Sequence, residues 1–230
     1  MHVEGLWRYP VKSLRGERLT TAELTDDGVR GDRVVHVRGR KGPLTGRTRH
    51  GLLTVPAVTG DDGVPWVAGH RWDSPAAAEE IRRAVGEPAD LVAYTGPERF
   101  DIGNLLVATD GAVEQFGHDV RRLRPNILVG GTLGDEERDW EGRALRIGTA
   151  VVGIFARRIR CVVTSIDPDS GEQDLDVFRE IRTRFDNRLA LDAWVITPGT
   201  IREGDQVEVV DTSAEPAHLG GWIVGAPYRA

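Results

Sequence analysis

Residues 157–171 read RRIRCVVTSIDPDSG, and this stretch holds Cys161, the single cysteine among 230 residues. Three arginines precede the thiol, β-branched residues follow it, and an Asp-Pro-Asp-Ser-Gly segment ends the stretch. β-Branched side chains favour strands, whereas Pro, Gly, Asp and Ser favour turns. The pattern therefore predicts a strand over residues 161–166 that is closed by a turn at residues 167–171.

The chemistry of Cys161 has two interpretations in the sequence. A thiol that lies among guanidinium groups is favoured as the thiolate, which attacks electrophiles and binds soft metals. A free cysteine is more commonly a small buried hydrophobic residue. The local sequence leaves both interpretations open, with the buried residue as the commoner case.

Length and composition describe an ordinary globular chain. Its 230 residues, 40% hydrophobic and 29% charged, can form one large β domain or two smaller ones. The net charge of −6 argues against a nucleic-acid partner, and no run of about 18 apolar residues could span a membrane. The first five residues lack the basic and apolar regions of a signal peptide. We therefore expect a cytoplasmic protein that binds neither nucleic acid nor membrane.

The motif content limits the chemistry further. One thiol cannot form an intrachain disulfide, a CxxC zinc site or a built-in iron–sulfur cluster. The sequence shows no GxGxxG, P-loop, GxSxG or HExxH pattern, and its six histidines are scattered without metal-ligand spacing. What remains is one thiol and separate Lys, Arg, Ser, Thr and Asn side chains at strand ends. Such a set suits one soft metal ligand and many donors to a large anionic cofactor.

Outside residues 157–171, short apolar and β-branched runs separated by turn residues predict strands along the whole chain. The predicted strands cover residues 3–9, 19–24, 34–37, 91–94, 127–129, 144–147, 150–155, 193–197 and 206–210. Only two or three helices interrupt them. Such a chain is a β-rich α+β protein, and its turn spacing predicts a barrel architecture.

Three segments carry helix signals. Residues 75–85 lie between a capping serine and a terminal glycine. A short helix is expected to end at Phe116, just before Gly117, and either Thr109 or Asp110 could be its N-terminal cap. Residues 174–186 place apolar side chains at helical spacing, which predicts an amphipathic helix with a buried stripe. The stripe consists of Leu175, Phe178, Ile181 and Phe185.

Two polar clusters next to predicted strands have alternative interpretations. Lys12 and Ser13 offer a cation and a hydroxyl, a pair suited to a phosphate, but they also suit a solvated turn. Arg121, Arg122 and Arg124 precede a predicted strand, where they could clamp an anion by bidentate contacts or serve as surface charge. The local sequence decides neither case.

Six motifs in order resemble the MOSC family, which is named after the C-terminal domain of molybdenum cofactor sulfurase. Within that family the chain is most similar to stand-alone molybdoenzymes of the amidoxime-reducing type. The resemblance covers about residues 1–212, and the six motifs together are specific although each alone is weak. The motifs are YPVKS at 9–13, GVRGDR at 28–33, TGR at 45–47, RLRPNI at 122–127, RCVVTSIDPDSG at 160–171 and PGTIREGD at 198–205.

The resemblance implies a fold and a site. Residues 1–95 would form a MOSC N-terminal β-barrel-like domain, residues 96–212 a MOSC β-barrel domain with a few short helices, and residues 213–230 a C-terminal tail. Cys161 would be the catalytic residue and the thiolate ligand to the metal of a molybdenum cofactor, Mo-molybdopterin. The implied cofactor-binding residues are Lys12, Ser13, Arg33, Arg124 and Asn126, with a looser match at Thr109 and Asp110.

The resemblance also implies an activity. The chain would be a molybdenum-dependent oxidoreductase that removes oxygen at molybdenum from small N-hydroxylated substrates, namely amidoximes and hydroxylamines. Because one cysteine cannot hold an iron–sulfur cluster, electrons would come from a separate flavoprotein, ferredoxin or haem protein. The alternative is a non-catalytic cofactor carrier, or a sulfur relay through a Cys161 persulfide. The pyridoxal-phosphate domain of the sulfurases has no counterpart here, so we expect that the chain itself does not mobilise sulfur. Ile159 stands where the reductases often have a serine.

Overall fold

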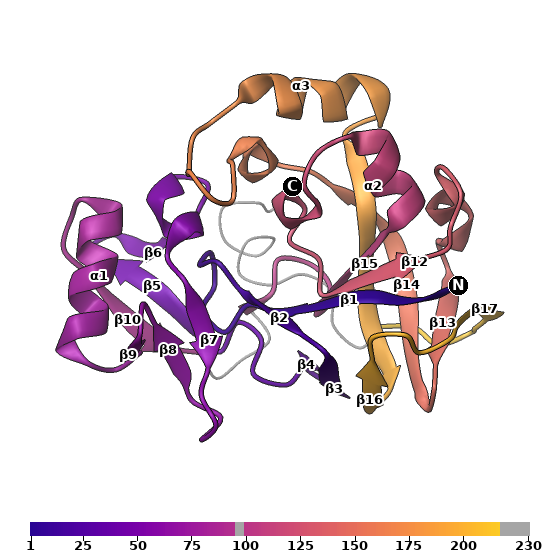
Figure 1. Cartoon of the computed structure of the whole chain (residues 1–230), viewed down its shortest axis with the longest axis horizontal. Helices are drawn as coiled ribbons and strands as arrows, with labels where there is room; N and C mark the ends of the chain where they lie inside the picture. Colours follow the sequence, from indigo (N-terminus) through magenta and orange to yellow (C-terminus); the bar gives the residue numbers. More distant parts are fainter. Residues whose placement is uncertain (95–98, 217–230) are drawn as a thin grey trace.

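The fold is built from one large sheet and three small ones. The computed structural model describes residues 1–94 and 99–216. Within these residues, one sheet has eight strands and three sheets have three strands each. Figure 1 shows the large sheet on one side of the molecule and two small sheets, with a helix packed beside them, on the other. The β-rich α+β class predicted from the sequence is confirmed.

The large sheet combines strands from both ends of the chain. In spatial order it contains β17 (Val207–Asp211), β13 (Arg143–Ile147), β14 (Ala150–Ile159), β15 (Arg188–Thr197), β11 (Leu105–Thr109), β12 (Ile127–Gly130), β1 (His2–Arg8) and β2 (Glu17–Leu19). Neighbouring strands are antiparallel except β11 and β12, which are parallel. The first strand of the chain therefore lies inside a sheet whose other members come mostly from the C-terminal half.

The small sheets complete the described strands. One contains β16 (Gly199–Arg202), β3 (Thr21–Thr25) and β4 (Gly28–Val29). A second contains β10 (Ala89–Ala93), β5 (Val35–Gly39) and β6 (Gly42–Leu44). The third contains β7 (Ala57–Thr59), β8 (Pro65–Val67) and β9 (His70–Arg71).

Strand pairing crosses the predicted division between residues 1–95 and 96–212. β1 pairs with β12, and β3 pairs with β16 near the end of the chain. The predicted boundary itself falls at residues 95–98, and most of the predicted tail falls at residues 217–230; both segments lie outside the described residues. The two-domain division stays a prediction.

Three α-helices and several 3₁₀ turns connect the described strands. The α-helices are α1 (Pro75–Val85), α2 (Asp110–Phe116) and α3 (Leu175–Arg184). The 3₁₀ turns are η1 (His50–Thr54), η3 (Val120–Arg122), η4 (Glu136–Trp140) and η5 (Val162–Ser165). Among the helices that the structure describes, none combines the length and the apolar composition that a bilayer span requires.

The predicted helix caps are confirmed. Ser74 Oγ accepts a hydrogen bond from the Ala77 N–H at 3.2 Å, and Thr109 Oγ1 accepts one from the Ala112 N–H at 3.4 Å. Both of these helices, α1 and α2, end at a glycine with a left-handed backbone, Gly86 and Gly117. Of the two capping candidates for α2, the structure therefore selects Thr109.

The strand predicted at residues 161–166 is wrong. β14 ends two residues before Cys161, and the chain then enters the 3₁₀ turn η5. Thr164 Oγ1 donates to the Cys161 carbonyl at 2.9 Å, and Ser165 Oγ donates to the Val162 carbonyl at 2.6 Å. Such side-chain bonds to a nearby backbone compete with a strand ladder, so they override the β propensity of the valines.

The buried stripe of α3 also differs from the predicted one. Leu175 is 42% exposed and Phe178 is only half-buried, whereas Val177, Ile181 and Phe185 are buried. These three residues follow one another at spacings of four, so they lie on one face of the helix. They pack with residues of α2 in a shared apolar cluster. Leu175 lies in the first turn of the helix, outside this cluster.

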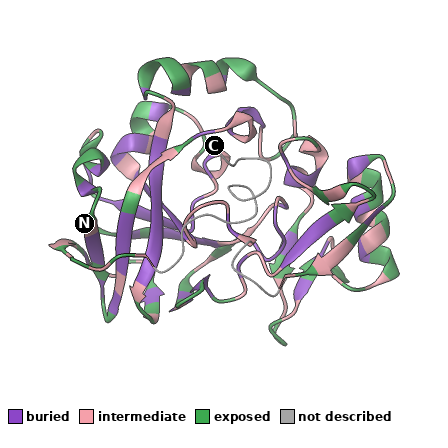
Figure 2. Cartoon of the chain, turned by 180° about the vertical axis from the view of Figure 1, so that it is seen from behind, coloured by how far each residue is buried: buried purple, intermediate pink, exposed green. Residues whose placement is uncertain are grey.

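Two larger apolar cores support the two sides of the fold. One packs against the large sheet and includes Val107, Leu145 and Ile154. The other packs α1 onto the sheets of β5 and β8 and includes Val37 and Ile81. Figure 2 shows buried residues along the strands of the large sheet and exposed residues on the outer surface of α3.

Replacing Ser74 by Ala should lower the free energy of unfolding by about 1 kcal/mol, because the first turn of α1 loses its side-chain acceptor. Urea unfolding followed by circular dichroism measures the difference. Ser74→Asp keeps an acceptor and should retain most of the stability. Equal stability of Ser74→Ala and the unsubstituted protein would show that the cap contributes nothing.

Candidate cofactor-binding site

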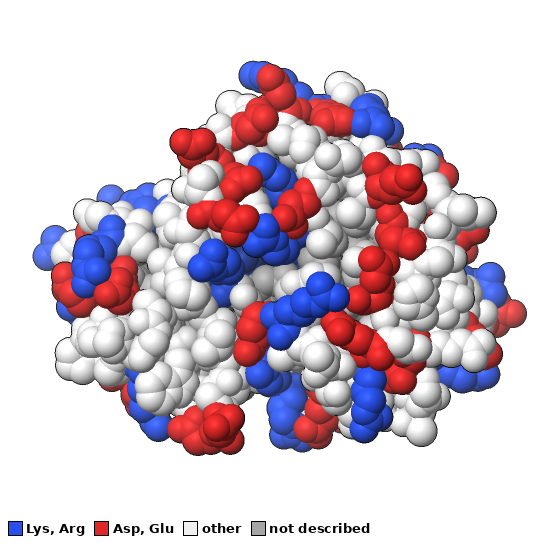
Figure 3. Space-filling view, viewed as in Figure 1, with Lys and Arg blue, Asp and Glu red and all other residues white. Residues whose placement is uncertain are grey.

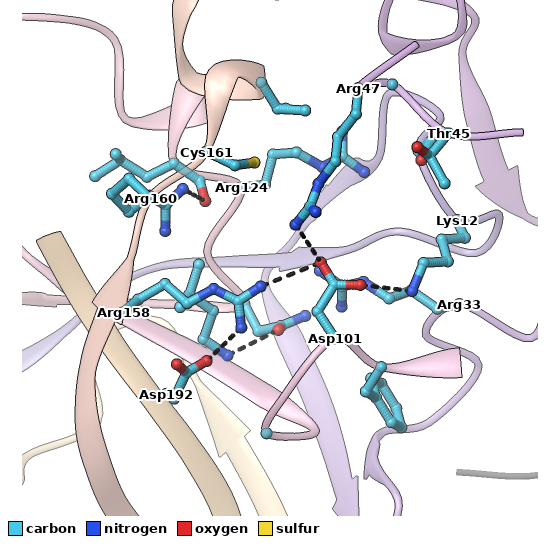
Figure 4. Close-up of a pocket in the computed structure, with 18 of the residues that line it drawn as sticks. Lys12, Arg33, Thr45, Arg47, Asp101, Arg124, Arg158, Arg160, Cys161 and Asp192 are labelled. Carbon is cyan, nitrogen blue, oxygen red and sulfur yellow. Dashed lines mark hydrogen bonds and ion pairs between the residues drawn. The ribbon is translucent and has the colours of Figure 1, made fainter. Parts of the chain in front are cut away.

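A cavity of about 110 Å³ lies where loops from both halves of the chain meet. Its wall combines the segments after β1, β4 and β6, the segments before β11 and β12, the end of β14 and one side chain of β15. Figure 4 shows Cys161, Arg158 and Arg160 on one side of it and Lys12, Arg33 and Thr45 on the other. The cavity is therefore a product of the tertiary fold, not of one local motif.

Six of the predicted site residues line this cavity. They are Cys161, Lys12, Ser13, Arg33, Arg124 and Asn126, and they come from four separate segments of the chain. Asn126 is buried and fastens the wall: its Oδ1 accepts from the Leu106 N–H at 3.1 Å, and its Nδ2 donates to the Trp7 carbonyl at 3.3 Å. The other five present side chains that can bind a ligand.

Cys161 points its sulfur into the cavity (Figure 4). The residue is half-buried, and none of the apolar clusters of the described residues includes it. Its neighbour Arg160 is held by three hydrogen bonds: the backbone N–H donates to the Asn187 carbonyl at 2.9 Å, Nη2 to the Leu123 carbonyl at 2.8 Å and Nη1 to the Leu189 carbonyl at 3.5 Å. The geometry therefore favours a thiol that faces a ligand over a cysteine that packs in a core.

A carboxylate, that of Asp101, lies among the cations of the cavity. Its Oδ1 accepts from Lys12 Nζ at 2.7 Å, and its Oδ2 accepts from Arg158 Nη2 at 3.1 Å. The Oδ2 atom also lies 4.0 Å from Arg47 Nη2. Arg158 Nη1 in turn donates to Asp192 Oδ1 at 2.7 Å. One carboxylate thus orients three cations that come from distant parts of the chain (Figure 4).

Burial and charge set the protonation of this cluster. Burial lowers the pKa of Lys12 to about 8, although the charge of Asp101 acts in the opposite direction. Burial by itself would raise the pKa of Asp101, but Lys12, Arg158 and Arg47 together lower it to about 2. Near neutral pH, Asp101 is therefore a fixed negative charge, and Lys12 is the cation of the cluster that loses its proton first.

The cavity carries more cations than carboxylates. Among the described residues of its wall, the cations are Lys12, Arg33, Arg47, Arg124, Arg158 and Arg160, and the carboxylates are Asp101 and Asp192. Guanidinium and ammonium groups bind oxyanions through charge-assisted hydrogen bonds. The excess of positive charge therefore favours a ligand with several negative charges.

Three residues of the wall hold backbone conformations that are unusual for side chains with a Cβ atom. The φ angle is +70° at Ser13, +52° at Arg33 and +57° at Arg124. Each such residue costs on the order of 1–3 kcal/mol and persists only where the surrounding structure holds it. The Arg33 N–H donates to the Tyr9 carbonyl at 2.7 Å, and the Arg124 N–H donates to the Arg121 carbonyl at 3.1 Å. Strained residues cluster at functional sites, so these three mark the same cavity independently of its charge.

Comparison with known proteins agrees with this architecture. Residues 107–208 match the MOSC domain, and residues 1–62 match the MOSC N-terminal beta barrel domain. The chain is a MOSC-domain protein. The resemblance that the six motifs indicated is thereby confirmed. The MOSC family is associated with binding of the molybdenum cofactor.

The MOSC protein also has relatives among named proteins and solved structures. Mitochondrial amidoxime-reducing component 1 of Mus musculus is 24% identical over 89% of this chain and 81% of its own length. Mitochondrial amidoxime reducing component 2 of Macaca fascicularis is 30% identical over 36% of this chain and 27% of its own length. The YUAD protein from Bacillus subtilis aligns with 92% of this chain and 96% of its own, at 12% identity and a TM-score of 0.47.

The donor set of the MOSC cavity fits a molybdenum cofactor. A thiolate is a soft ligand that suits a metal already bound to sulfur, and Cys161 presents the sulfur of this cavity. The excess of guanidinium groups suits the phosphate that such a cofactor carries. The residues that could hold its phosphate and pterin are Lys12, Ser13, Arg33 and Arg124.

Two predicted cofactor residues lie outside the cavity, and the structure gives them a different role. Thr109 caps α2 and donates from Oγ1 to Glu137 Oε2 at 2.9 Å. Asp110 accepts hydrogen bonds from the backbone N–H groups of Gly131 and Thr132 at 2.7 and 2.9 Å. Both side chains are already used to fasten the start of α2 to the segment after β12, so the structure does not place them with the other predicted ligands.

Five charged wall residues were missed by the sequence reasoning: Arg47, Asp101, Arg158, Arg160 and Asp192. For the arginines a signal existed, since Arg47 ends the TGR motif and Arg158 lies two positions before Arg160 at the end of a strand. For Asp101 and Asp192 the sequence contained no such signal. Their partners lie 89 and 34 residues away in the chain.

Anion binding should weaken as the pH rises through the Lys12 pKa of about 8, because the lysine then loses its charge. Sulfate is a suitable probe because its charge is constant over this range, and isothermal titration calorimetry measures its affinity on both sides of that pKa. In Asp101→Asn the weakening should begin at lower pH, since the carboxylate that favours the charged lysine is gone.

Lys12→Gln is the control for this titration. It should bind sulfate weakly and with little change over the same pH range. The same pH profile in Lys12→Gln and in the unsubstituted protein would assign the titration to another group.

Proposed function

We propose that this MOSC protein is a molybdenum-cofactor-dependent oxidoreductase that reduces small N-hydroxylated compounds such as amidoximes and hydroxylamines. The observation that carries the proposal is the thiol of Cys161, which faces a cavity with an excess of cations. The two relatives named for amidoxime reduction support the choice of reaction. The six sequence motifs support it as well.

The reaction is a two-electron reduction. An amidoxime takes up two electrons and two protons, its N–O bond breaks, and an amidine and one water molecule are formed. The bound cofactor would supply the two-electron redox chemistry of its metal. The electrons would come from a separate donor protein of the flavoprotein, ferredoxin or haem class, or from a chemical reductant in an assay.

The residues of the chain would bind the cofactor and orient it. Cys161 offers its sulfur as the metal ligand, and the backbone on either side of it is fixed by η5 and by the bonds of the buried Arg160. Asp101 keeps Lys12 Nζ in the cavity, where the ammonium group can bind a phosphate oxygen. The remaining donors for phosphate and pterin come from Ser13, Arg33 and Arg124.

A non-catalytic carrier would use the same binding residues, and so would a sulfur relay through a Cys161 persulfide. Metal content therefore does not separate the carrier from the enzyme. An assay of amidoxime reduction by the loaded protein, with a chemical electron donor, separates the enzyme from the carrier. Molybdenum-loaded protein that turns over no amidoxime would favour the carrier.

Cys161→Ala should lower amidoxime reduction by about 100-fold or more, because alanine offers the metal no ligand. It should retain much of the pterin, since the phosphate donors lie on other segments. The measurements are reduction of acetamidoxime with a reduced viologen dye, together with molybdenum and pterin content. An active, metal-loaded Cys161→Ala protein would end the assignment of Cys161 as the metal ligand.

Cys161→Ser serves as the matched control, because it keeps the size of the side chain and replaces a soft ligand by a harder one. It should also lose activity. Both variants should change the free energy of unfolding by less than about 1 kcal/mol, since the thiol lies outside the apolar clusters of the described residues.

A further inference from the structure

The carboxylate of Asp101 lies at the meeting point of three cations. It contacts Lys12, Arg158 and Arg47, each of which belongs to a different segment of the cavity wall. Figure 4 shows its two oxygens between Lys12 on one side and Arg158 on the other. Ammonium and guanidinium groups bind the oxygens of phosphate and sulfate as they bind those of a carboxylate. The three cations therefore have the arrangement of an oxyanion subsite, which the Asp101 carboxylate fills.

Carboxylates on the molecular surface are paired differently. On η3, Arg121 Nη2 lies 2.6 Å from Asp119 Oδ2 and 2.7 Å from Asp169 Oδ2, so two carboxylates serve one arginine. Figure 3 shows side chains of both charges interleaved around the middle of the face that carries β1 and β2. At Asp101 the ratio is reversed, because one carboxylate serves three cations. Three cations attract a ligand with more charge and more oxygen atoms more strongly than they attract one carboxylate.

The position of Asp101 allows its carboxylate to leave the cations. Residues 100–104 form bends before β11 rather than a strand or a helix, and the Asp101 side chain is 28% exposed. Asp192, another carboxylate of the described wall and also a partner of Arg158, is only 4% exposed and lies on β15. Rotation of the Asp101 side chain toward solvent breaks no strand pairing, whereas Asp192 is held within the large sheet. An incoming anion can therefore replace Asp101 more easily than Asp192.

The size of the cavity gives an independent reason for movement. Its volume of about 110 Å³ is below the range of roughly 300–1,000 Å³ that is typical of pockets for small organic ligands. Phe100, Asp101 and Gly103 of the bend segment line it. A ligand as large as a phosphate-bearing pterin therefore needs part of the wall to give way, and this segment is a part that can.

We propose that the Asp101 carboxylate is an internal ligand of the oxyanion subsite, and that an incoming phosphate-like dianion displaces it. The dianion brings two charges and four oxygen atoms in place of one charge and two oxygen atoms. It therefore offers Lys12, Arg47 and Arg158 stronger charge-assisted hydrogen bonds. Before the exchange, the carboxylate lowers the cost of holding these cations together. An anion with a single charge gains less from the exchange, so the internal ligand selects for dianions.

Two sources can supply such a dianion: the phosphate of the proposed cofactor and a free inorganic oxyanion. Both present the same chemistry to the three cations. The exchange does not depend on the proposed reduction, because it requires only that an anion binds. Sulfate binding to the cofactor-free protein therefore tests it separately.

Asp101→Asn removes the charge of the internal ligand and keeps the size of the side chain. At pH 6, below the Lys12 pKa of about 8, sulfate should bind the cofactor-free variant about tenfold more tightly than the unsubstituted protein. Isothermal titration calorimetry measures both affinities. A factor of about ten corresponds to an internal contact that is formed about 90% of the time, since the apparent affinity falls with the fraction of binding-competent protein.

Asp192→Asn is the matched control. It removes one negative charge from the same wall and from a partner of the same arginine, but it leaves the contact between Asp101 and Lys12 in place. The sulfate affinity should change by less than about twofold. An equal gain in the two variants would overturn the inference, because the gain would then reflect only the net charge of the wall. An unchanged affinity in Asp101→Asn would overturn it as well.

A crystal structure of the cofactor-free protein with sulfate observes the exchange directly, and it decides the question even if Asp192→Asn does not fold. We expect sulfate within hydrogen-bonding distance of Lys12 and Arg158, with the Asp101 side chain turned toward solvent. Sulfate in the cavity beside an intact contact between Asp101 and Lys12 would contradict the exchange.

The pterin content identifies the source of the dianion. If the phosphate of the cofactor uses the subsite, Asp101→Asn should carry more pterin than the unsubstituted protein when both are produced with limiting cofactor. Equal pterin content together with tighter sulfate binding would assign the subsite to a free oxyanion. Failure of the proposed function is a separate result: the loaded unsubstituted protein would reduce no acetamidoxime, whatever the sulfate affinities are.

Discussion

The ion cluster around Asp101 is the interaction on which the site depends. One carboxylate accepts hydrogen bonds from Lys12 and Arg158 and lies near Arg47. Like charges that are partly buried together repel one another, and a buried charge without a partner is costly. Asp101 offsets part of that cost while leaving the cavity positive as a whole. Because its partners are residues 12, 47 and 158, which lie far apart in the chain, the same contact sets both the shape of the cavity and its charge.

Two neighbouring cavities differ in how far their arginines are paired with carboxylates. In the first, cations exceed carboxylates, which favours a ligand with several negative charges. A second cavity, of about 390 Å³, lies between η3 and η5 on one side and β1 and β2 on the other, and there carboxylates pair with the guanidinium groups of Arg121 and Arg122 on η3. Arg124 belongs to both: its guanidinium donates to the Leu14 carbonyl at 2.8 Å and lies over the Tyr9 ring.

The backbone supports the same arrangement. Ser13, Arg33 and Arg124 adopt left-handed conformations, and each lies in a loop next to a strand that is held by a sheet. β1 pairs with β12 in the large sheet, so the loops that carry Lys12 and Arg124 follow and precede neighbouring strands. Local strain of this kind persists only where the surrounding structure holds it. The insertion of the first strand into the sheet of the MOSC half provides that support.

The sequence by itself determined the elements and the chemistry that depend on near neighbours. The caps at Ser74 and Thr109 involve residues within three positions, and the motif around Cys161 carries the identity of the thiol and the family. The turn after Cys161 is also local, because the hydroxyl groups of Thr164 and Ser165 bond to carbonyls three residues back, although the β propensity of the valines predicted a strand there. The tertiary structure alone decided which distant groups meet. It also decided the central role of Asp101, the fastening role of Asp110 and the second cavity. These features need groups that are distant in the chain, and such groups meet only when strands from both ends enter one sheet.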